Sequence, residues 1–166
     1  AYTNIYGKVG SAVTLAQLQN NTTLEFIKKH YNSITMENEM KPDALLGYSP
    51  NKITVAEAKK KGYIIPSGYS EQYVPEINYS NIDKALKIAK DNNLSVRFHT
   101  LVWHSQTPDW FFKNNFSNSQ GLVSKSTMDG RLEYYIKNVM AHVHSSKYSD
   151  VVYAWDVVNE YLHSSN

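Results

Sequence analysis

Two kinds of hydrophobic pattern alternate along the chain. Short runs rich in β-branched and aromatic residues, which are typical of strands, occur at residues 6–14, 32–40, 94–106 and 151–158. Between them the apolar residues recur every three or four positions, as on one face of a helix, at residues 15–31, 80–93 and 128–146. This strict alternation of strand and helix predicts an α/β fold built on a parallel sheet with right-handed crossovers.

The connection between the second strand and the helix at 80–93 departs from this rhythm. Residues 41–79 are rich in Pro, Gly, Ser and Tyr, and they contain one short helical stretch at 54–62. Long structured connections are usually functional or insertions. Elsewhere the expected N-caps are Thr22 or Thr23 in the first helical segment and Ser80 or Asn81 in the second.

The remaining question of fold is how the sheet closes. Four parallel strands fit either one edge of an open doubly wound sheet or one half of a closed barrel. No glycine-rich phosphate loop follows any of the strands, which argues against a nucleotide-binding sheet.

Composition excludes several classes of function. The 166 residues are enough for one domain, and the net charge of +2 comes from 17 basic and 15 acidic residues without a dense basic block, so we expect no nucleic-acid partner. No apolar run approaches the roughly 20 residues that span a bilayer, and the chain starts without a signal-peptide pattern, so we expect a soluble chain with no membrane partner. Cysteine is absent, which excludes disulfides, thiolate metal sites and a cysteine nucleophile.

Polar side chains gather where three consecutive strands end. The end of the second strand carries Glu37, Asn38, Glu39 and Lys41, the third His99, Trp103, His104 and Gln106, and the fourth Asn159 and Glu160. A single acidic residue at a strand end is usually a helix cap or a surface group. Because the carboxyl ends of parallel strands share one rim, three consecutive ends of this kind indicate a functional site.

Several chemistries compete for these residues. The two histidines could be core residues bonded to the backbone, and His99, His104, Glu37 and Glu160 could surround a cation. The His-x-His pair of a metal-dependent hydrolase barrel is absent, however, and so is the Gly-x-Ser-x-Gly turn of a serine hydrolase. Glycoside hydrolysis fits best, because it needs a protonated carboxyl, donors for sugar hydroxyls and an aromatic platform.

Three segments resemble those of a known family. "TMENEMKPD", "HTLVWHSQTPDW" and "WDVVNE" are similar, in this order, to the signature segments of glycoside hydrolase family 10, the endo-β-1,4-xylanases. The resemblance covers nearly the whole chain except about residues 46–76, where the link is longer than usual. It implies a (β/α)8 barrel of which residues 1–166 form about the first four βα units, and a retaining mechanism without metal or cofactor. It also implies xylan or xylo-oligosaccharide as substrate and a secreted or cell-surface location.

The resemblance also assigns roles to individual positions. Glu160 matches the catalytic acid/base, and Asn159 matches the residue that bonds the sugar 2-hydroxyl beside it. The family's contacts to the glycone-side sugar correspond here to Glu37, Asn38 and Lys41. The residues that line the subsite next to the cleaved bond correspond to His99, Trp103 and Gln106.

Two departures from the family pattern affect these expectations. Phe98 stands where the family has a small residue, so packing behind His99 should differ. The family's nucleophile lies on a seventh strand, which these residues do not contain. We therefore expect this chain to be the N-terminal half of the catalytic barrel, to be inactive alone, and to need a complementary C-terminal half as partner. The alternative is a carbohydrate-binding or scaffold protein that keeps a half barrel without turnover.

Two details of the site follow from mechanism and geometry. A retaining enzyme places its two carboxylates roughly 5 to 5.5 Å apart. Glu37 and Glu39 are the nearby candidates for the second one, although the resemblance assigns Glu37 to substrate binding. Adjacent residues of a regular strand face opposite sides, so a shared substrate for Asn159 and Glu160 predicts a bulge or a break in strand geometry at residues 158–160.

Overall fold

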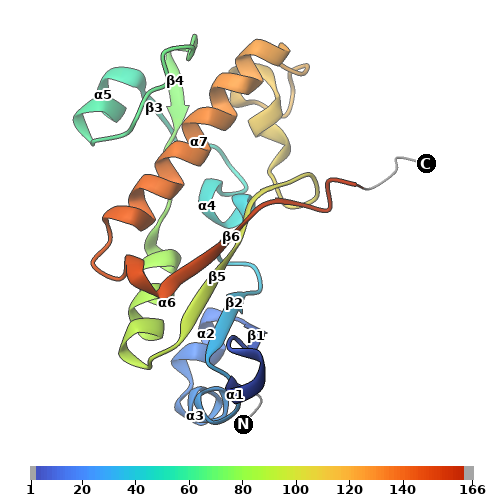
Figure 1. The fold of residues 1–166 in the computed structure, drawn as a ribbon. Coiled ribbons are helices and arrows are strands. Elements are labelled where there is room, and N and C mark those ends of the chain that lie inside the picture. The colour runs from blue at the N-terminus through green and yellow to red at the C-terminus, as the bar shows by residue number, and fades with distance from the viewer. Residues whose placement is uncertain (1–2, 163–166) are drawn as a thin grey trace.

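Residues 3–162 are described by a computed structural model, and their main feature is a four-stranded sheet in the order β1-β2-β5-β6 (Figure 1). The strands are β1 (Gly10–Val13), β2 (Ser33–Met36), β5 (Ser95–Trp103) and β6 (Val152–Asn159). Every neighbouring pair is parallel, and the order across the sheet follows the order along the chain. The parallel direction predicted from the alternating pattern is therefore confirmed, and the sequential order is the one expected for part of a barrel.

Helices connect the strands and cover one face of the sheet (Figure 1). Their bounds are α1 Thr3–Tyr6, α2 Leu15–Gln19, α3 Asn21–His30, α4 Pro42–Leu46, α5 Val55–Lys60, α6 Ser80–Asp91 and α7 Lys125–Ser145. Three short 3₁₀ turns complete the connections: η1 (Asp109–Phe112), η2 (Asn114–Phe116) and η3 (Ser149–Val151).

The first helical segment is divided, and its predicted N-caps are wrong. A capping box between Thr14 and Gln17 starts α2. Asn20 has extended backbone angles, and its side chain accepts a hydrogen bond from the backbone N–H of Thr23, which starts α3. Thr22 and Thr23 consequently lie inside the second helix. Asn20 is the cap because it lies three residues before the free backbone N–H of Thr23 and its side chain can reach that group. Thr22 and Thr23 are already inside the first turn.

Other element boundaries also differ from the expected ones. Tyr6 belongs to α1, so the first strand is shorter than its hydrophobic run. Helix α6 has Tyr79 at its N-cap position, and the side chain of Asn78 accepts from the backbone N–H of Ser80 instead. Ser80 and Asn81, the two predicted caps, are therefore the first residues of the helix.

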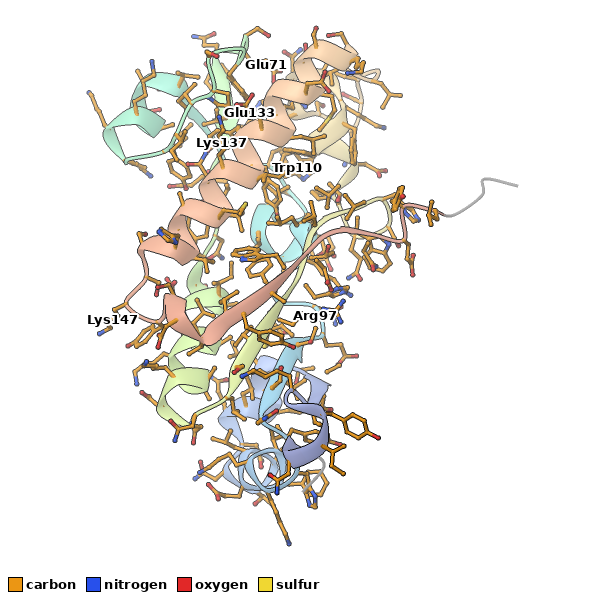
Figure 2. The ribbon with its side chains drawn as sticks, in the orientation of Figure 1. Glu71, Arg97, Trp110, Glu133, Lys137 and Lys147 are labelled. Carbon is orange, nitrogen blue, oxygen red and sulfur yellow. The ribbon has the colours of Figure 1, made fainter. Side chains whose placement is uncertain are left out.

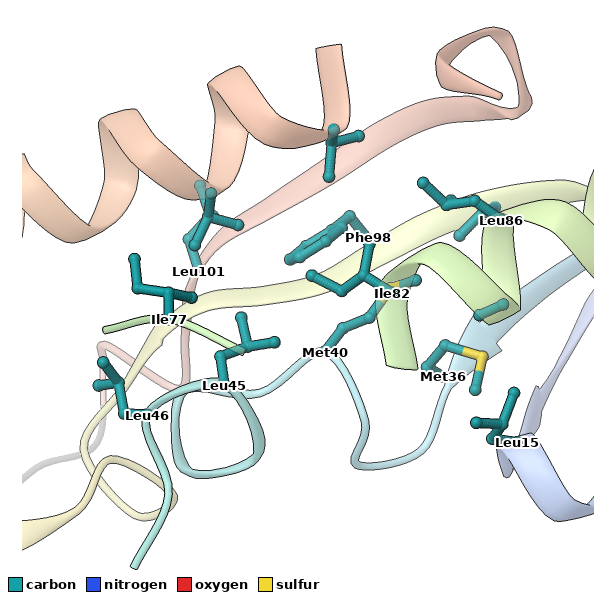
Figure 3. Packing of buried hydrophobic residues seen from close by; sticks show 14 of the residues in the cluster. Leu15, Met36, Met40, Leu45, Leu46, Ile77, Ile82, Leu86, Phe98 and Leu101 are labelled. Atoms are coloured by element: carbon teal, nitrogen blue, oxygen red, sulfur yellow. The ribbon is translucent and has the colours of Figure 1, made fainter. Parts of the chain in front are cut away.

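The hydrophobic core lies between the sheet and helices α4, α6 and α7, and Figure 3 shows part of it. Phe98 of β5 is fully buried, near Ile82 and Leu86 of α6 (Figure 3), and stacks on Trp155 of β6 with ring centroids 4.4 Å apart. Burial of such a ring stabilises the fold by roughly 1.5–3 kcal/mol. The large residue at position 98 thus packs in the layer between sheet and helices, on the side of β5 away from His99.

The opposite face of the sheet and its last edge are open within residues 3–162. Arg97 and His99 alternate with Phe98 and therefore lie on this second face. Strand β6 is the outermost strand, and Val157 and Val158 are 56% and 49% exposed. The hydrophobic run at 151–158 suggests a buried strand, but no residue of β6 is fully buried, because no described element packs beyond it.

The 46–76 segment folds into a small unit on the outside of α7 (Figure 1). Strands β3 (Lys52–Thr54) and β4 (Tyr73–Pro75) form a two-stranded antiparallel sheet, with the expected helix α5 between them. The side-chain amide of the buried Asn138 accepts from the backbone N–H of Ile64 through Oδ1 and donates to the Ile64 carbonyl through Nδ2. The hydroxyl of Tyr134 donates to the carbonyl of Pro75. The small sheet and α4 were not predicted from the sequence.

Candidate active site

Lys41 is the centre of the polar network on the rim. The residue is 8% exposed, and Nζ donates to Oε1 of Gln106 at 2.6 Å and to Oδ1 of Asn38 at 3.1 Å. Nζ also lies 4.8 Å from the ring centroid of Trp103, a cation–π contact. Lys41 is held at this point because it precedes Pro42, which occupies the first turn of α4.

Gln106 joins the loop after β5 to the loop after β2. Its Nε2 lies 3.3 Å from both Oδ1 of Asn38 and Oδ2 of Asp43. The backbone N–H of Asp43 donates to the Gln106 carbonyl at 3.0 Å. Sequence reasoning missed Asp43, although its place directly after Lys-Pro marks the start of a helix, where an acidic side chain is favourable.

The ends of β5 and β6 meet at Trp103 and Glu160. The indole N–H of Trp103 donates to Oε2 of Glu160 at 2.9 Å, and Trp103 is paired with Asn159 in the sheet register. Glu160 has φ 53°, in the left-handed region, so strand geometry ends at this residue. The predicted break is thus confirmed at Glu160. Such a conformation costs about 1–3 kcal/mol for a residue other than glycine, and it is concentrated at functional sites.

Deeper along the strands, His99 belongs to a separate cluster on the open face. Its Nδ1 lies 2.9 Å from Oδ2 of Asp156, while Nε and Nη2 of Arg97 donate to Oδ1 at 2.9 and 2.7 Å. The carboxylate only accepts, so Nδ1 of His99 carries a proton in this bond. The His99–Thr100 peptide bond is cis. Asp156 was missed, although a charged residue inside an apolar strand is itself a signal.

The remaining rim residues are less closely joined. Glu37 is exposed at the end of β2, and its carboxylate makes no hydrogen bond or ion pair within residues 3–162. Glu39 accepts from the backbone N–H groups of Leu15 at 2.6 Å and of Asn38 at 3.2 Å, so it holds the start of α2. His104 lies beside Trp103 with ring centroids 6.2 Å apart. Of the two carboxylates considered as the second catalytic group, Glu39 is therefore already hydrogen-bonded to the backbone.

A cavity of about 610 Å³ opens beside the ends of β5 and β6 and extends from the rim toward α7. Trp103, Asn159 and Glu160 lie on its polar side, and Phe111 and Phe112 form part of an apolar wall. Asn159 and Glu160, adjacent in sequence, thus line the same cavity. A carboxyl group beside aromatic rings can give a proton to a ligand whose flat face rests on those rings.

The part of the chain that the structure describes contains no group of three or more His, Asp or Glu side chains arranged to hold a metal ion. The four residues considered as cation ligands are not gathered around one point: His99 bonds Asp156, and Glu160 bonds Trp103. Among the described helices, none has the length and apolar character required to cross a membrane.

Comparison with known proteins places these features in one family. The profile of glycosyl hydrolase family 10 matches residues 1–166. Endo-1,4-beta-xylanase A of Butyrivibrio fibrisolvens is 49% identical over 162 residues, which are 97% of this chain and 39% of that protein. Endo-1,4-beta-xylanase Y of Acetivibrio thermocellus is 41% identical over 93% of this chain and 13% of its own length.

Solved structures agree with the sequence comparison. The Clostridium thermocellum xylanase 10B modules, crystallised with xylohexaose, superimpose with a TM-score of 0.74 at 40% identity, over 95% of this chain and 27% of that chain. A psychrophilic endo-β-1,4-xylanase of family 10 superimposes with a TM-score of 0.70 at 29% identity, over 99% of this chain and 42% of that chain. The chain therefore spans about two fifths or less of the length of these proteins, and its sheet corresponds to the first βα units of their (β/α)8 barrel.

Proposed function

We propose that this chain, which belongs to glycosyl hydrolase family 10, forms the acid/base side of a retaining endo-β-1,4-xylanase. The observation that carries the proposal is the hydrogen bond from Trp103 to Glu160, at the end of a network that also includes Asn38, Lys41 and Gln106. This arrangement sets a carboxyl group beside an aromatic ring and several donors for hydroxyl groups, which is what cleavage of a glycosidic bond requires.

In the proposed reaction Glu160 is the acid/base. It gives its proton to the leaving glycosidic oxygen and later takes one from the attacking water. Asn159 bonds the 2-hydroxyl of the sugar whose bond is broken. On the glycone side the contacts are Glu37, Asn38 and Lys41, and next to the cleaved bond they are His99, Trp103 and Gln106.

The proposed substrate is xylan or a xylo-oligosaccharide. Support comes from the relatives, which are named endo-1,4-beta-xylanases, and from the superimposed xylanase 10B, which was crystallised with xylohexaose. A polysaccharide of this size is reached outside the cell, so the complete protein is proposed to be secreted or held on the cell surface.

The proposed partner is the complementary C-terminal half of the barrel, which supplies the nucleophile. Parallel sheets are normally covered on both faces, whereas here Arg97 and Asp156 lie on an uncovered face and β6 is an unpaired edge among the described residues. The relatives are also longer than this chain. Residues 1–166 alone are therefore proposed to be inactive.

The test of the acid role uses Glu160→Ala in the full gene product. Turnover of xylan should fall by several orders of magnitude, while the first step on activated aryl xylosides, which need little protonation, should be largely spared. Asn38→Ala is the matched comparison, because it should weaken both substrates alike. Equal losses on both substrates for Glu160→Ala would contradict the acid role.

The test of the partner uses two separately purified pieces, residues 1–166 and the remainder of the gene product. Xylan hydrolysis, measured as new reducing ends, should appear only after mixing. A fragment 1–166 that melts cooperatively, binds xylan and gains no activity on mixing would support the carbohydrate-binding alternative instead.

A further inference from the structure

The 46–76 segment is bonded to the loop that follows β5 as well as to α7. We define this rim loop as residues 107–116. The indole N–H of Trp110 donates to the carbonyl of Gly47 at 3.0 Å, and Nζ of Lys52 donates to the carbonyl of Asn115 at 3.1 Å. The segment and the rim loop are therefore held to each other at both ends of the loop.

The strongest link between them passes through Arg131 of α7. This side chain is fully buried, and its Nε and Nη2 donate to the two carboxylate oxygens of Glu71 at 2.6 and 2.5 Å. Nη1 donates to the carbonyls of Phe111 at 2.6 Å and Lys113 at 3.0 Å, and Cζ lies 3.7 Å from the ring centroid of Phe116. A planar guanidinium thus binds a planar carboxylate on one side and the rim loop on the other.

The two carbonyls that Arg131 holds belong to residues on either side of Phe112. Phe111 and Phe112 form part of the apolar wall of the cavity whose polar side carries Trp103 and Glu160. Phe111 itself is buried, whereas Phe112 is partly exposed. The orientation of this wall therefore depends on where Arg131 holds the backbone of the rim loop.

Glu71 in turn decides where Arg131 lies. A guanidinium buried without a carboxylate partner is strongly unfavourable, so the pair keeps one geometry. Figure 2 shows Glu71 and Trp110 beside the stretch of α7 that also carries Glu133 and Lys137. Gly130 of α7 faces the backbone of Gly68 and Tyr69, in the same segment as Glu71.

We infer that Glu71 and Arg131 are positioning residues: they set the wall formed by Phe112, so that the 46–76 segment raises affinity for the sugar chain without touching it. The inference rests on the proposed function, because it assigns the cavity to the same substrate. It gives the 46–76 segment a role in binding beyond its contribution to the fold.

The expected effect is on affinity and not on turnover. Glu160 is held by Trp103 and by the backbone of β6, neither of which contacts Arg131. Movement of the wall would weaken contacts made equally to the substrate and to the transition state. Loss of such uniform binding raises KM and leaves kcat unchanged.

The test is Glu71→Gln in the full gene product, assayed on xylo-oligosaccharides. KM should rise about three- to tenfold, with kcat within about twofold of wild type, because one of the two bonds and the negative charge are removed. Hydrogen exchange of the amides in residues 107–123 should also become faster. Glu133→Gln is the matched control on the same helix, since it breaks the exposed pair with Lys137 and should change neither KM nor exchange.

The outcomes are distinguishable from those of the proposed function. A wild-type gene product that does not hydrolyse xylan would overturn the proposed function together with this affinity effect. An active wild type with unchanged KM in Glu71→Gln, whether or not exchange is faster, would overturn the positioning role alone. If Glu71→Gln fails to fold, Lys52→Gln is the substitute, because it removes an exposed hydrogen bond between the 46–76 segment and the rim loop. Lys52→Gln should also raise KM, by a smaller factor. An unchanged KM in Lys52→Gln would equally overturn the role of the 46–76 segment in positioning the rim loop.

Discussion

The indole N–H of Trp103 donates to Oε2 of Glu160 across 2.9 Å, and this bond joins the carboxyl ends of β5 and β6. Trp103→Phe keeps an aromatic ring near Lys41 but removes the donor. A hydrogen bond to a charged group contributes about 1.5–3 kcal/mol when shielded, and partial exposure reduces this, so we expect kcat on xylan to fall about tenfold. Steady-state kinetics of the full gene product measure the effect.

Trp103→Ala is the comparison, because it removes the ring as well and should raise KM in addition. If Trp103→Phe leaves kcat unchanged, the indole N–H has no part in positioning Glu160.

A second prediction concerns Asp156, whose carboxylate lies between Arg97 and His99. Asn offers one neutral carbonyl oxygen where the carboxylate offers two charged ones, so Asp156→Asn sets an amide N–H against either Arg97 or Nδ1 of His99. In both orientations His99 loses its charged acceptor. We expect a loss of about 1–3 kcal/mol in the free energy of unfolding and at least about a tenfold loss in kcat/KM. Denaturant unfolding and kinetics measure the two effects.

Arg97→Gln is the matched control for this change, since the Arg97 side chain is 52% exposed and its loss leaves the bond between His99 and Asp156 intact. Its expected cost is below about 1 kcal/mol, with kcat/KM preserved. Equal effects of the two variants on kcat/KM would contradict a role for Asp156 in orienting His99.

A third prediction concerns two adjacent tyrosines of α7. The hydroxyl of Tyr135 is buried and has no hydrogen-bond partner among the described residues, whereas the hydroxyl of Tyr134 donates to the carbonyl of Pro75 at 2.9 Å. We expect Tyr135→Phe to raise the free energy of unfolding by about 1 kcal/mol and Tyr134→Phe to lower it by about the same amount. Denaturant unfolding of both variants measures the difference, and a loss of stability in Tyr135→Phe would reveal a partner for its hydroxyl.

A fourth prediction concerns alkaline pH. Burial raises the pKa of Tyr69, Tyr79, Tyr134 and Tyr135 well above the ordinary value near 10. Because the folded pKa exceeds the unfolded one, the folded state holds these protons more tightly. The resulting stability is present below about pH 10 and is lost as the pH rises above it.

We therefore expect these tyrosines to ionise only when the chain unfolds. Absorbance of tyrosinate and circular dichroism, followed together from pH 9 upward, should show part of the 13 tyrosines titrating in the same transition as unfolding. Tyrosine ionisation that is complete while the circular dichroism remains native would contradict the burial of these hydroxyls.

Much of the fold and the rim could be predicted from the sequence. Apolar residues repeat every second position in a strand and about every 3.6 positions in a helix, so the sequence shows that strands and helices alternate. This alternation predicts that the strands are parallel. The location of Lys41, Trp103 and Glu160 on one rim follows from the parallel direction, which brings all carboxyl ends to the same edge. The break at Glu160 followed from the need for two adjacent side chains to face one ligand.

The tertiary structure decided what each polar group is used for. Glu39 looks like a site carboxylate in the sequence, yet it caps α2 through a backbone N–H 24 positions away. Arg131 sits in an apolar helical pattern and reads as a surface charge, yet it is fully buried on Glu71, 60 positions away. Period and local propensity report only which face of an element is apolar. The partner of a charged side chain is chosen by packing between elements distant in sequence, where desolvation makes an unpaired charge too unfavourable to tolerate.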